Sequence, residues 1–416
     1  MCEMKTTKFK MTELGPIPVD WEVKRLGECC ARIKNGFTYS VCNRGAYKIS
    51  RIETISKGVV NYSRVGYVKD APPAEYMLSN GDILFSHINS LPYIGNVALY
   101  DGKELLYHGM NLLLLRCNER ANANYLYYAL SSAPMRSRAR ELAKIAINQA
   151  SISIGDLSRS EIPLPPLAEQ RRIAGALSDI DELISALGKL IEKKRNIKTG
   201  AMQELLGMRN EECGMRNVPR RRLPGFSGEW VEKRLGEIAS FETATIGVDK
   251  IDGEWYIGTE NMLAEKAGVE KNLTPVPYVT VKEYKVGDVL ISNIRPYLKK
   301  IWLADRDGGC STDVLVVRTI DNRICTPMFL KMLLSDDSFF DFTMANAVGT
   351  KMPRGDKKVI VNYQVHLPTI AEQRAIAAVL SDMDAEIAAL EAKRAKYESI
   401  KQGMMQELLT GKTRLV

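Results

Sequence analysis

The segment Asn293–Lys300 concentrates side chains that could recognise a nucleic acid. Asn293, Arg295, Tyr297, Lys299 and Lys300 bring an amide, a guanidinium, a phenol and two ammonium groups to an expected strand end or turn. Arginine can read guanine and asparagine can read adenine through paired hydrogen bonds, whereas lysine mainly contacts phosphate. An ordinary polar hairpin can carry the same residues, so DNA binding is one of two interpretations of this segment.

A matching segment lies in the first half of the chain. GDILFSHINSLPYIGNVALY (Gly81–Tyr100) is similar to GDVLISNIRPYLKKIWLAD (Gly287–Asp305). Its candidate contacts are His87, Asn89 and Tyr93, and it is far less basic. The shared outline and different charge predict different sequence preferences in the two halves.

Further cations lie on an expected helix, Ala123–Ala146, and in the loop Gly349–Lys358. The corresponding loop of the first half is polar, with the sequence NQASIS (Asn148–Ser153). Such cations could hold backbone phosphates, but a solvated helix face or basic loop is the ordinary alternative. The candidates are Arg136, Arg140 and Lys144 at four-residue spacing on the helix, and Lys351, Arg354, Lys357 and Lys358 in the loop.

Motifs for catalysis are missing from the sequence. There is no G-x-S-x-G, H-E-x-x-H or G-x-G-x-x-G, and Gly411-Lys412-Thr413 lacks the earlier glycine of a phosphate-binding loop, since that position is Gln406. There is also no Asn/Asp-Pro-Pro-Tyr/Phe motif for methyl transfer. The three histidines stand far apart, and the eight cysteines form no C-x-x-C pair, so no metal site is expected. We therefore expect a binding protein without catalytic residues.

Composition is that of a globular protein with a mild basic excess. The chain has 416 residues, 45% hydrophobic and 26% charged, with a net charge of +8. This length allows roughly two to four domains, and the charge is compatible with nucleic acid. No secretory signal or apolar run of membrane length is present, so we expect a cytoplasmic protein with reduced thiols and no membrane contact.

An internal repeat organises the chain. Leu164–Leu206 and Leu367–Leu409 are identical at 24 of 43 aligned positions, at a constant offset of 203 residues. In each copy a proline, Pro165 or Pro368, precedes an apolar pattern of helical period, which predicts one long helix of about 65 Å.

The apolar residues of each copy repeat every seven residues, which favours a coiled coil. The natural partner of each helix is the other copy, although two separate core helices would also explain the pattern. Lysine and arginine interrupt the seam midway. The expected seam residues are Ile173, Leu177, Ile180, Ile184, Leu187 and Ile191 in the first copy, and Ile376, Leu380, Met383, Ile387 and Leu390 in the second.

Each long helix follows a segment with short runs typical of strands. WEVKRLGE (Trp21–Glu28) and WVEKRLGE (Trp230–Glu237) occupy corresponding places, and Thr326–Phe342 resembles the expected helix of the first half. The expected strands are Ala46–Ile55, Val59–Val68, Gly81–Phe85 and Leu112–Arg116. The sequence predicts an α+β protein of globular domains at 1–162 and 211–366, each followed by a helical segment, at 163–210 and 367–416. An exposed linker is expected at Gly207–Arg222.

With these repeats, the chain resembles a type I restriction–modification specificity subunit. The resemblance rests on PLPPLAEQRRIAGALSDID (Pro163–Asp181), LPTIAEQRAIAAVLSDMD (Leu367–Asp384), the two MQELL ends and the repeated W-x-x-KRLGE and GD-[IV]-L stretches. It covers essentially the whole chain. It implies two target recognition domains that each read half of a split DNA site, held apart by two antiparallel spacer helices.

The resemblance also implies partners. Two modification (methyltransferase) subunits would dock on the helices and methylate adenine, and restriction subunits would join for cleavage. The chain itself would bind no cofactor: S-adenosylmethionine would be held by the modification subunit, and ATP and Mg by the restriction subunit. Recognition domains diverge too widely in this family for base-contacting positions to be carried over.

Two other functions would fit the pattern. A coiled-coil scaffold could use its globular domains to bind proteins, and DNA binding would differ from this by a steep loss of affinity with salt. A fused enzyme is the other alternative, but the two halves already occupy all 416 residues.

Overall fold

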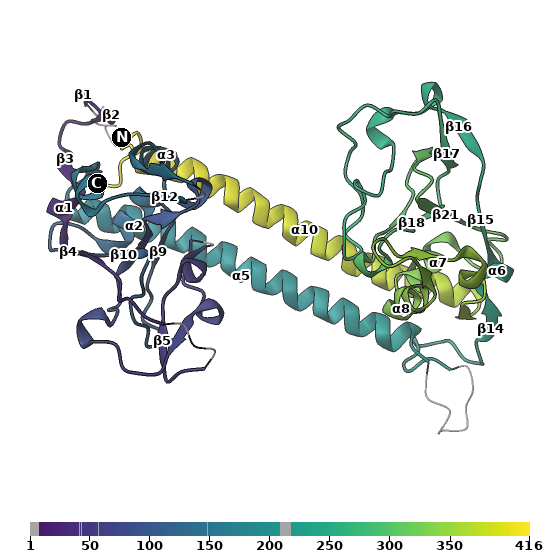
Figure 1. Ribbon diagram of the computed structural model, residues 1–416. Helices are drawn as coiled ribbons and strands as arrows, with labels where there is room; N and C mark the ends of the chain where they lie inside the picture. The colour runs from purple at the N-terminus through teal and green to yellow at the C-terminus, as the bar shows by residue number, and fades with distance from the viewer. Residues whose placement is uncertain (1–7, 41, 43, 57, 148, 209–217) are drawn as a thin grey trace. The chain divides into compact units, whose positions relative to one another are not determined.

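The computed structural model describes residues 8–416 except 41, 43, 57, 148 and 209–217 (Figure 1). The predicted linker Gly207–Arg222 therefore lies largely outside the described residues. The chain divides into two compact units: unit 1 comprises residues 1–188 and 392–416, and unit 2 comprises residues 189–391. Each unit combines one globular half of the sequence, the start of the long helix that follows it, and the end of the other long helix.

The two predicted long helices are present as α5 (Leu167–Leu206) and α10 (Ile370–Leu408). Their predicted seam residues are mostly buried. In unit 1 these are Ile173, Leu177, Ile180 and Leu187, and in unit 2 they are Ile191, Ile376, Leu380 and Ile387. Ile184, Met383 and Leu390 are half-buried.

Within each unit, the start of one long helix packs against the end of the other. In unit 1, Leu177 of α5 shares a core with Leu408 of α10, and the yellow end of α10 lies beside the start of α5 in Figure 1. In unit 2, Leu380 of α10 shares a core with Leu205 of α5. The helix segments of each unit are therefore antiparallel, as predicted.

Ion pairs replace apolar contacts at the basic seam positions. In unit 2, Lys194 Nζ lies 2.6 Å from Glu386, and Lys198 pairs with Asp384. In unit 1, Lys401 Nζ lies 2.6 Å from Asp181. Because each lysine meets a carboxylate of the other helix, these pairs favour one register of the seam. Arg394 is different, since it is exposed and pairs with Glu398 on its own helix, 2.9 Å away.

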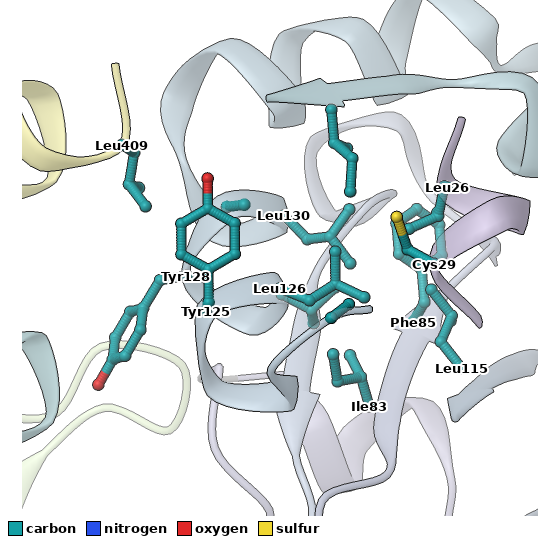
Figure 2. Close-up of a cluster of buried hydrophobic side chains, with 14 of the residues drawn as sticks. Leu26, Cys29, Ile83, Phe85, Leu115, Tyr125, Leu126, Tyr128, Leu130 and Leu409 are labelled. Atoms are coloured by element: carbon teal, nitrogen blue, oxygen red, sulfur yellow. The ribbon is translucent and has the colours of Figure 1, made fainter. Parts of the chain in front are cut away.

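The globular part of unit 1 is built on a four-stranded antiparallel sheet with the order β4-β10-β7-β9. All four residues of β7 are buried, which makes it a central strand. Figure 2 shows Ile83 and Phe85 of β7 and Leu115 of β10 packed against Leu126 and Leu130 of α2. The strands are β4 (Cys30–Asn35), β7 (Ile83–Ser86), β9 (Val97–Leu99) and β10 (Leu112–Cys117).

Smaller elements surround this sheet. A three-stranded sheet consists of β8 (Ile88–Asn89), β11 (Lys144–Ala146) and β12 (Gln149–Ser151). Three two-stranded sheets pair β1 (Phe9–Thr12) with β2 (Gly15–Pro18), β3 (Glu22–Arg25) with β13 (Glu161–Leu164), and β5 (Tyr47–Ile49) with β6 (Gly66–Val68). The helices are α1 (Leu26–Cys29), α2 (Ala123–Ser131), α3 (Ala133–Leu142) and α4 (Ile154–Arg159).

Unit 2 repeats this plan with a four-stranded sheet of order β15-β21-β18-β19. Its strands are β15 (Ala239–Phe241), β18 (Val289–Ser292), β19 (Ile301–Leu303) and β21 (Val314–Thr319). A three-stranded sheet consists of β16 (Thr245–Gly247), β17 (Thr280–Tyr284) and β20 (Gly308–Cys310). Two two-stranded sheets pair β14 (Val231–Arg234) with β24 (Gln364–Leu367) and β22 (Ala347–Val348) with β23 (Arg354–Gly355). The helices are α6 (Leu235–Ile238), α7 (Pro327–Leu334), α8 (Asp337–Ala345) and α9 (Lys357–Ile360).

The repeated Gly-Asp dipeptide forms the same turn in both units. Gly81 and Gly287 have φ of +90° and +87°, a conformation that glycine adopts without strain. The aspartates that follow are buried and bind arginines of the neighbouring strand: Asp82 lies 2.7 Å from Arg116, and the equivalent pair in unit 2 repeats this distance.

Three sequence predictions need correction. The expected helix Ala123–Ala146 is two helices followed by strand β11, because Ser132 is extended and Pro134 begins a new first turn. The expected strand Ala46–Ile55 is β5 followed by a 3-10 helix, Ile52–Ile55. The expected strand Val59–Val68 contains a 3-10 helix, Tyr62–Arg64, before β6.

Candidate nucleic-acid interface

In unit 1, a hairpin and a distant loop form one surface. Strand β12 pairs with β11 on one side and β8 on the other, so that Asn89 faces Ala150 and Lys144 faces Ser151. A 3-10 turn, Leu91–Tyr93, directly follows β8. The fold thus brings Asn89 and Lys144, 55 positions apart in the sequence, into one small sheet.

Only some candidate side chains of unit 1 are available for a ligand. Tyr93, Arg140 and Lys144 are exposed, and within the described parts of the chain no carboxylate lies within ion-pair distance of Arg140 or Lys144. Asn89 is half-buried. Its Nδ2 donates to Ser86 Oγ (3.0 Å) and its Oδ1 accepts from the amide of Ser90 (2.8 Å).

Three candidates of unit 1 lie differently from the sequence expectation. His87 is only 7% exposed, and burial lowers its pKa to about 4, so as placed the neutral ring cannot reach a base edge. Arg136 is half-buried and donates to Asn96 Oδ1 at 2.6 Å. Lys144 belongs to β11, so the three expected cations do not form a stripe on one helix.

Unit 2 has the same arrangement. The hairpin β22–β23 contacts the segment after β18 through a bridge between Ile294 and Arg354, and the amide of Arg295 donates to the carbonyl of Pro353 (2.9 Å). A 3-10 turn, Pro296–Leu298, follows, as in unit 1. Arg295 and Arg354 therefore lie on neighbouring backbone segments.

The segment Arg295–Lys299 has an uncommon backbone. Arg295 and Lys299 have φ of 52° and 51°, in the left-handed region that non-glycine residues rarely occupy and that often marks a functional loop. Both Arg295 and Tyr297 are exposed. Lys299 pairs with Asp337 (2.9 Å) and Lys300 donates to the carbonyl of Thr259 (2.7 Å).

The remaining candidates of unit 2 divide in the same way. Lys351 and Lys358 are exposed, and no carboxylate among the described residues forms an ion pair with either. Arg354 lies 3.1 Å from Asp313, and Lys357 lies over the ring of Phe241. Lys357 and Lys358 begin α9 and are not part of a loop. Asn293 is half-buried, and its Oδ1 receives no hydrogen bond from the described residues.

The glutamines of the repeated AEQR stretch have a structural role that the sequence did not show. Gln170 Oε1 accepts from the amide of Asn122 (2.8 Å), and Gln170 Nε2 donates to the carbonyl of Pro165 (2.8 Å). Gln373 binds Thr326 and Pro368 in the same way, at 2.9 and 3.1 Å. Since Asn122 and Thr326 cap α2 and α7, each glutamine ties a globular domain to a long helix.

The glutamates of the same stretch form buried ion pairs. In unit 1, Glu169 is 2% exposed and binds Arg414 (2.7 Å) and the indole Nε1 of Trp21 (3.0 Å). In unit 2, Glu372 binds Arg222 at 2.9 and 2.6 Å. Arg414 and Arg222 each follow the end of a long helix and precede a leucine. We call these two glutamate–arginine pairs the clamps.

The comparison with known families gives the identity of this architecture. A family described as the type I restriction modification DNA specificity domain matches residues 18–196 and 227–401. The chain is a type I restriction–modification specificity subunit. Each match covers one globular half and more than half of its long helix.

Relatives of the specificity subunit extend over its whole length. The putative type I restriction enzyme MjaX specificity subunit of Methanocaldococcus jannaschii is 34% identical, over 99% of this chain and 98% of the relative. The MjaVIII specificity subunit of the same organism is 25% identical over 99% and 97%. The crystal structure of an S subunit from M. genitalium has the same fold, with a TM-score of 0.57 and 19% identity over 97% of this chain and 98% of that one.

Among the described residues, no helix is both long enough and apolar enough to cross a membrane.

Proposed function

We propose that this specificity subunit recognises a split DNA target, each hairpin surface reading one half. The observation that carries the proposal is the repeated placement of the two surfaces. Each unit presents an exposed tyrosine, exposed cations and a hairpin at the same point of the same fold, while the other side chains differ. The two hairpin surfaces have the same backbone arrangement but different side chains. This suits a DNA target whose two halves have different sequences.

Roles within each surface follow from exposure. Arg295 and Tyr297 in unit 2, and Tyr93 with the partly available Asn89 in unit 1, would contact base edges. The exposed cations Arg140, Lys144, Lys351 and Lys358 would contact phosphates, since no described carboxylate neutralises them. The α5 and α10 helices would set the distance between the two readers.

Catalysis would belong to partner subunits. Two modification subunits would bind S-adenosylmethionine and methylate adenine, and restriction subunits using ATP and Mg would cleave unmodified DNA. One solved complex that shares this fold, at a TM-score of 0.54 and 20% identity over 95% of this chain and 99% of that one, is described as showing complex assembly of the type I system. This supports a specificity subunit that assembles with other subunits.

The proposal is tested by DNA binding of the chain co-purified with its methyltransferase subunit. Arg295→Ala should relax specificity at one position of one half-site, at a cost of about 1–3 kcal/mol against the preferred base. Lys351→Ala should weaken binding to all sequences and reduce the salt slope by about one. Arg323→Ala is the control, because Arg323 is exposed and, among the described residues, its one ion pair is with nearby Asp321. Binding that hardly changes with salt would instead favour a protein-binding scaffold.

A further inference from the structure

The connecting turns of the two hairpins expose large apolar side chains. In unit 1, Ile145 is 72% exposed and Ile147 is 95% exposed; in unit 2, Val348 is 68% exposed and Met352 is 46% exposed. Ile147 and Met352 lie in the connections between the paired strands, and Ile145 and Val348 lie in the strands next to them. Both units therefore place apolar groups in water at the same position of the fold.

Among the described residues, none of these four side chains belongs to a hydrophobic core. Strand β11 is exposed at all three residues, whereas Ala150 on the neighbouring β12 is buried in the core of unit 1. Exposing a large aliphatic side chain forgoes roughly 1.5–3 kcal/mol relative to burying it. A hairpin that carries two of them at its end is suited to a partner that covers them.

The charged residues next to the apolar side chains favour DNA as that partner. Lys144 directly precedes Ile145 in unit 1, and Lys351 directly precedes Met352 in unit 2; both lysines are exposed and have no ion pair among the described residues. The core of a protein–protein interface is depleted in lysine. Proteins that bend DNA combine both features, because cations hold the phosphates while an apolar side chain enters between stacked bases.

We propose that each hairpin is a wedge, whose apolar side chains insert between two base pairs of the half-site that its unit reads. This inference rests on the proposed function and adds to it a way of deforming the target. A methyltransferase must extrude its adenine from the helix, and this costs less where stacking is already disturbed. The wedges would thus prepare the DNA for the partner subunits, and the sequence dependence of base-step flexibility would add to specificity.

The experiment uses the chain in complex with its methyltransferase subunit and a duplex that carries the recognised motif. 2-Aminopurine, whose fluorescence rises when it unstacks, is placed at one position at a time outside the methylated adenine. The wild-type complex should raise the fluorescence at one step in each half-site. Ile145→Ser/Ile147→Ser should abolish the rise in one half-site and weaken binding about tenfold, with an unchanged salt slope, since no phosphate contact is lost.

Matched variants separate the wedge from general effects. Val348→Ser/Met352→Ser should act only on the other half-site. Val59→Ser/Leu105→Ser, at residues of unit 1 that are 59% and 57% exposed outside the hairpin, should change neither signal. A mismatch at the affected step should restore the affinity of the Ile145→Ser/Ile147→Ser variant, because a mismatched step is already partly unstacked.

Three results would overturn the wedge. The serine variants could bind and unstack DNA like the wild type, or lose the methyltransferase subunit on purification, which would make the hairpin a protein-docking site. A mismatch could also fail to restore binding. If the wild-type complex binds no motif at all, the proposed function itself fails, and this outcome is visible before any variant is made.

Discussion

At the residue scale, the clamps explain why the repeated AEQR stretch is the same in both halves. A buried glutamate at the start of each long helix meets an arginine that follows the end of the other long helix. In unit 1 the carboxylates of Glu169 and Asp20 raise the pKa of Arg414, so the arginine stays charged. The globular domain, one helix start and one helix end are thereby joined at a single point.

Removing one partner of a clamp should destabilise its unit. Arg414→Ala leaves the Glu169 carboxylate buried without a cation, with the Trp21 indole and the Leu415 amide as its remaining partners among the described residues, and we expect a loss of about 3 kcal/mol in the free energy of unfolding of unit 1. Hydrogen exchange of unit 1 peptides in urea measures this. Arg222→Ala should affect unit 2 instead, and Arg323→Ala should affect neither. Equal effects of all three substitutions would contradict a specific role for the clamps.

Buried histidines predict that unit 1 is sensitive to acid. Burial lowers the pKa of His108 from 6.5 to about 4, and its Nε2 donates to the carbonyl of Leu112 (3.0 Å). Between these two pH values the unfolded chain binds a proton that the folded chain does not. Stability is therefore complete above pH 6.5 and falls as the pH drops toward 4, by up to about 3 kcal/mol for this residue.

His108→Gln should flatten this dependence, because glutamine can donate the same hydrogen bond without titrating. Urea midpoints of unit 1 at pH 7 and pH 5 provide the measurement. The half-buried His366 in unit 2 gives the comparison, since burial also lowers its pKa but less of the ring is buried. An identical loss of stability in His108→Gln and the wild type would show that other groups cause the acid sensitivity.

Residue types predicted the surface only in part. Arg295 and Tyr297, next to an expected strand, and Lys351, in an expected loop, were nominated from their residue types; all three are exposed, and their contact with DNA stays a prediction. His87 was also nominated, but it is buried, and its burial depends on strands that are distant in sequence. The clamps were missed for a similar reason: Arg414 and Arg222 follow their helices at different distances, which hides their equivalence.

At the element scale, periodicity predicted the long helices well. Seven-residue spacing of apolar residues is local information, and it identified α5, α10 and their seam. The break between α2 and α3 depends on a single proline within an otherwise helical pattern, and the pairing of β8 with β12 depends on contacts across 60 residues. Such pairings are set by tertiary packing and not by local propensity.

The helices should act as a ruler for the target. Inserting one heptad after Gly188 in α5 and one after Glu391 in α10 preserves the seam in both units and adds about 10 Å, or about three base pairs of DNA. The methylated motif of this variant should have a longer spacer and unchanged half-sites. A heptad in only one helix is the control, because it should disturb the seam. An unchanged spacer in the double insertion would refute the ruler.

At the scale of the whole molecule, the internal repeat combines a frame of elements that are the same in both units with two hairpin surfaces whose side chains differ. The frame comprises the long helices, the clamps, the glutamine ties and the Gly-Asp turns, which recur in both units with the same bonds. The hairpins and the turns beside them share a position but differ in charge. The family and the two-part organisation followed from the repeat in the sequence, whereas the target bases depend on side-chain geometry that no repeat encodes.

The central claim is that this chain selects the DNA sequence that its partners methylate. A genome-wide map of methylated adenine, compared between cells with this gene and cells lacking it, tests the claim most directly. One split motif, with two short specified parts around an unspecified spacer, should lose its methylation on deletion and regain it on complementation. In the same cells, Arg295→Ala should relax one specified part and leave the other intact. An unchanged map in cells that express the chain together with its methyltransferase subunit would contradict the account.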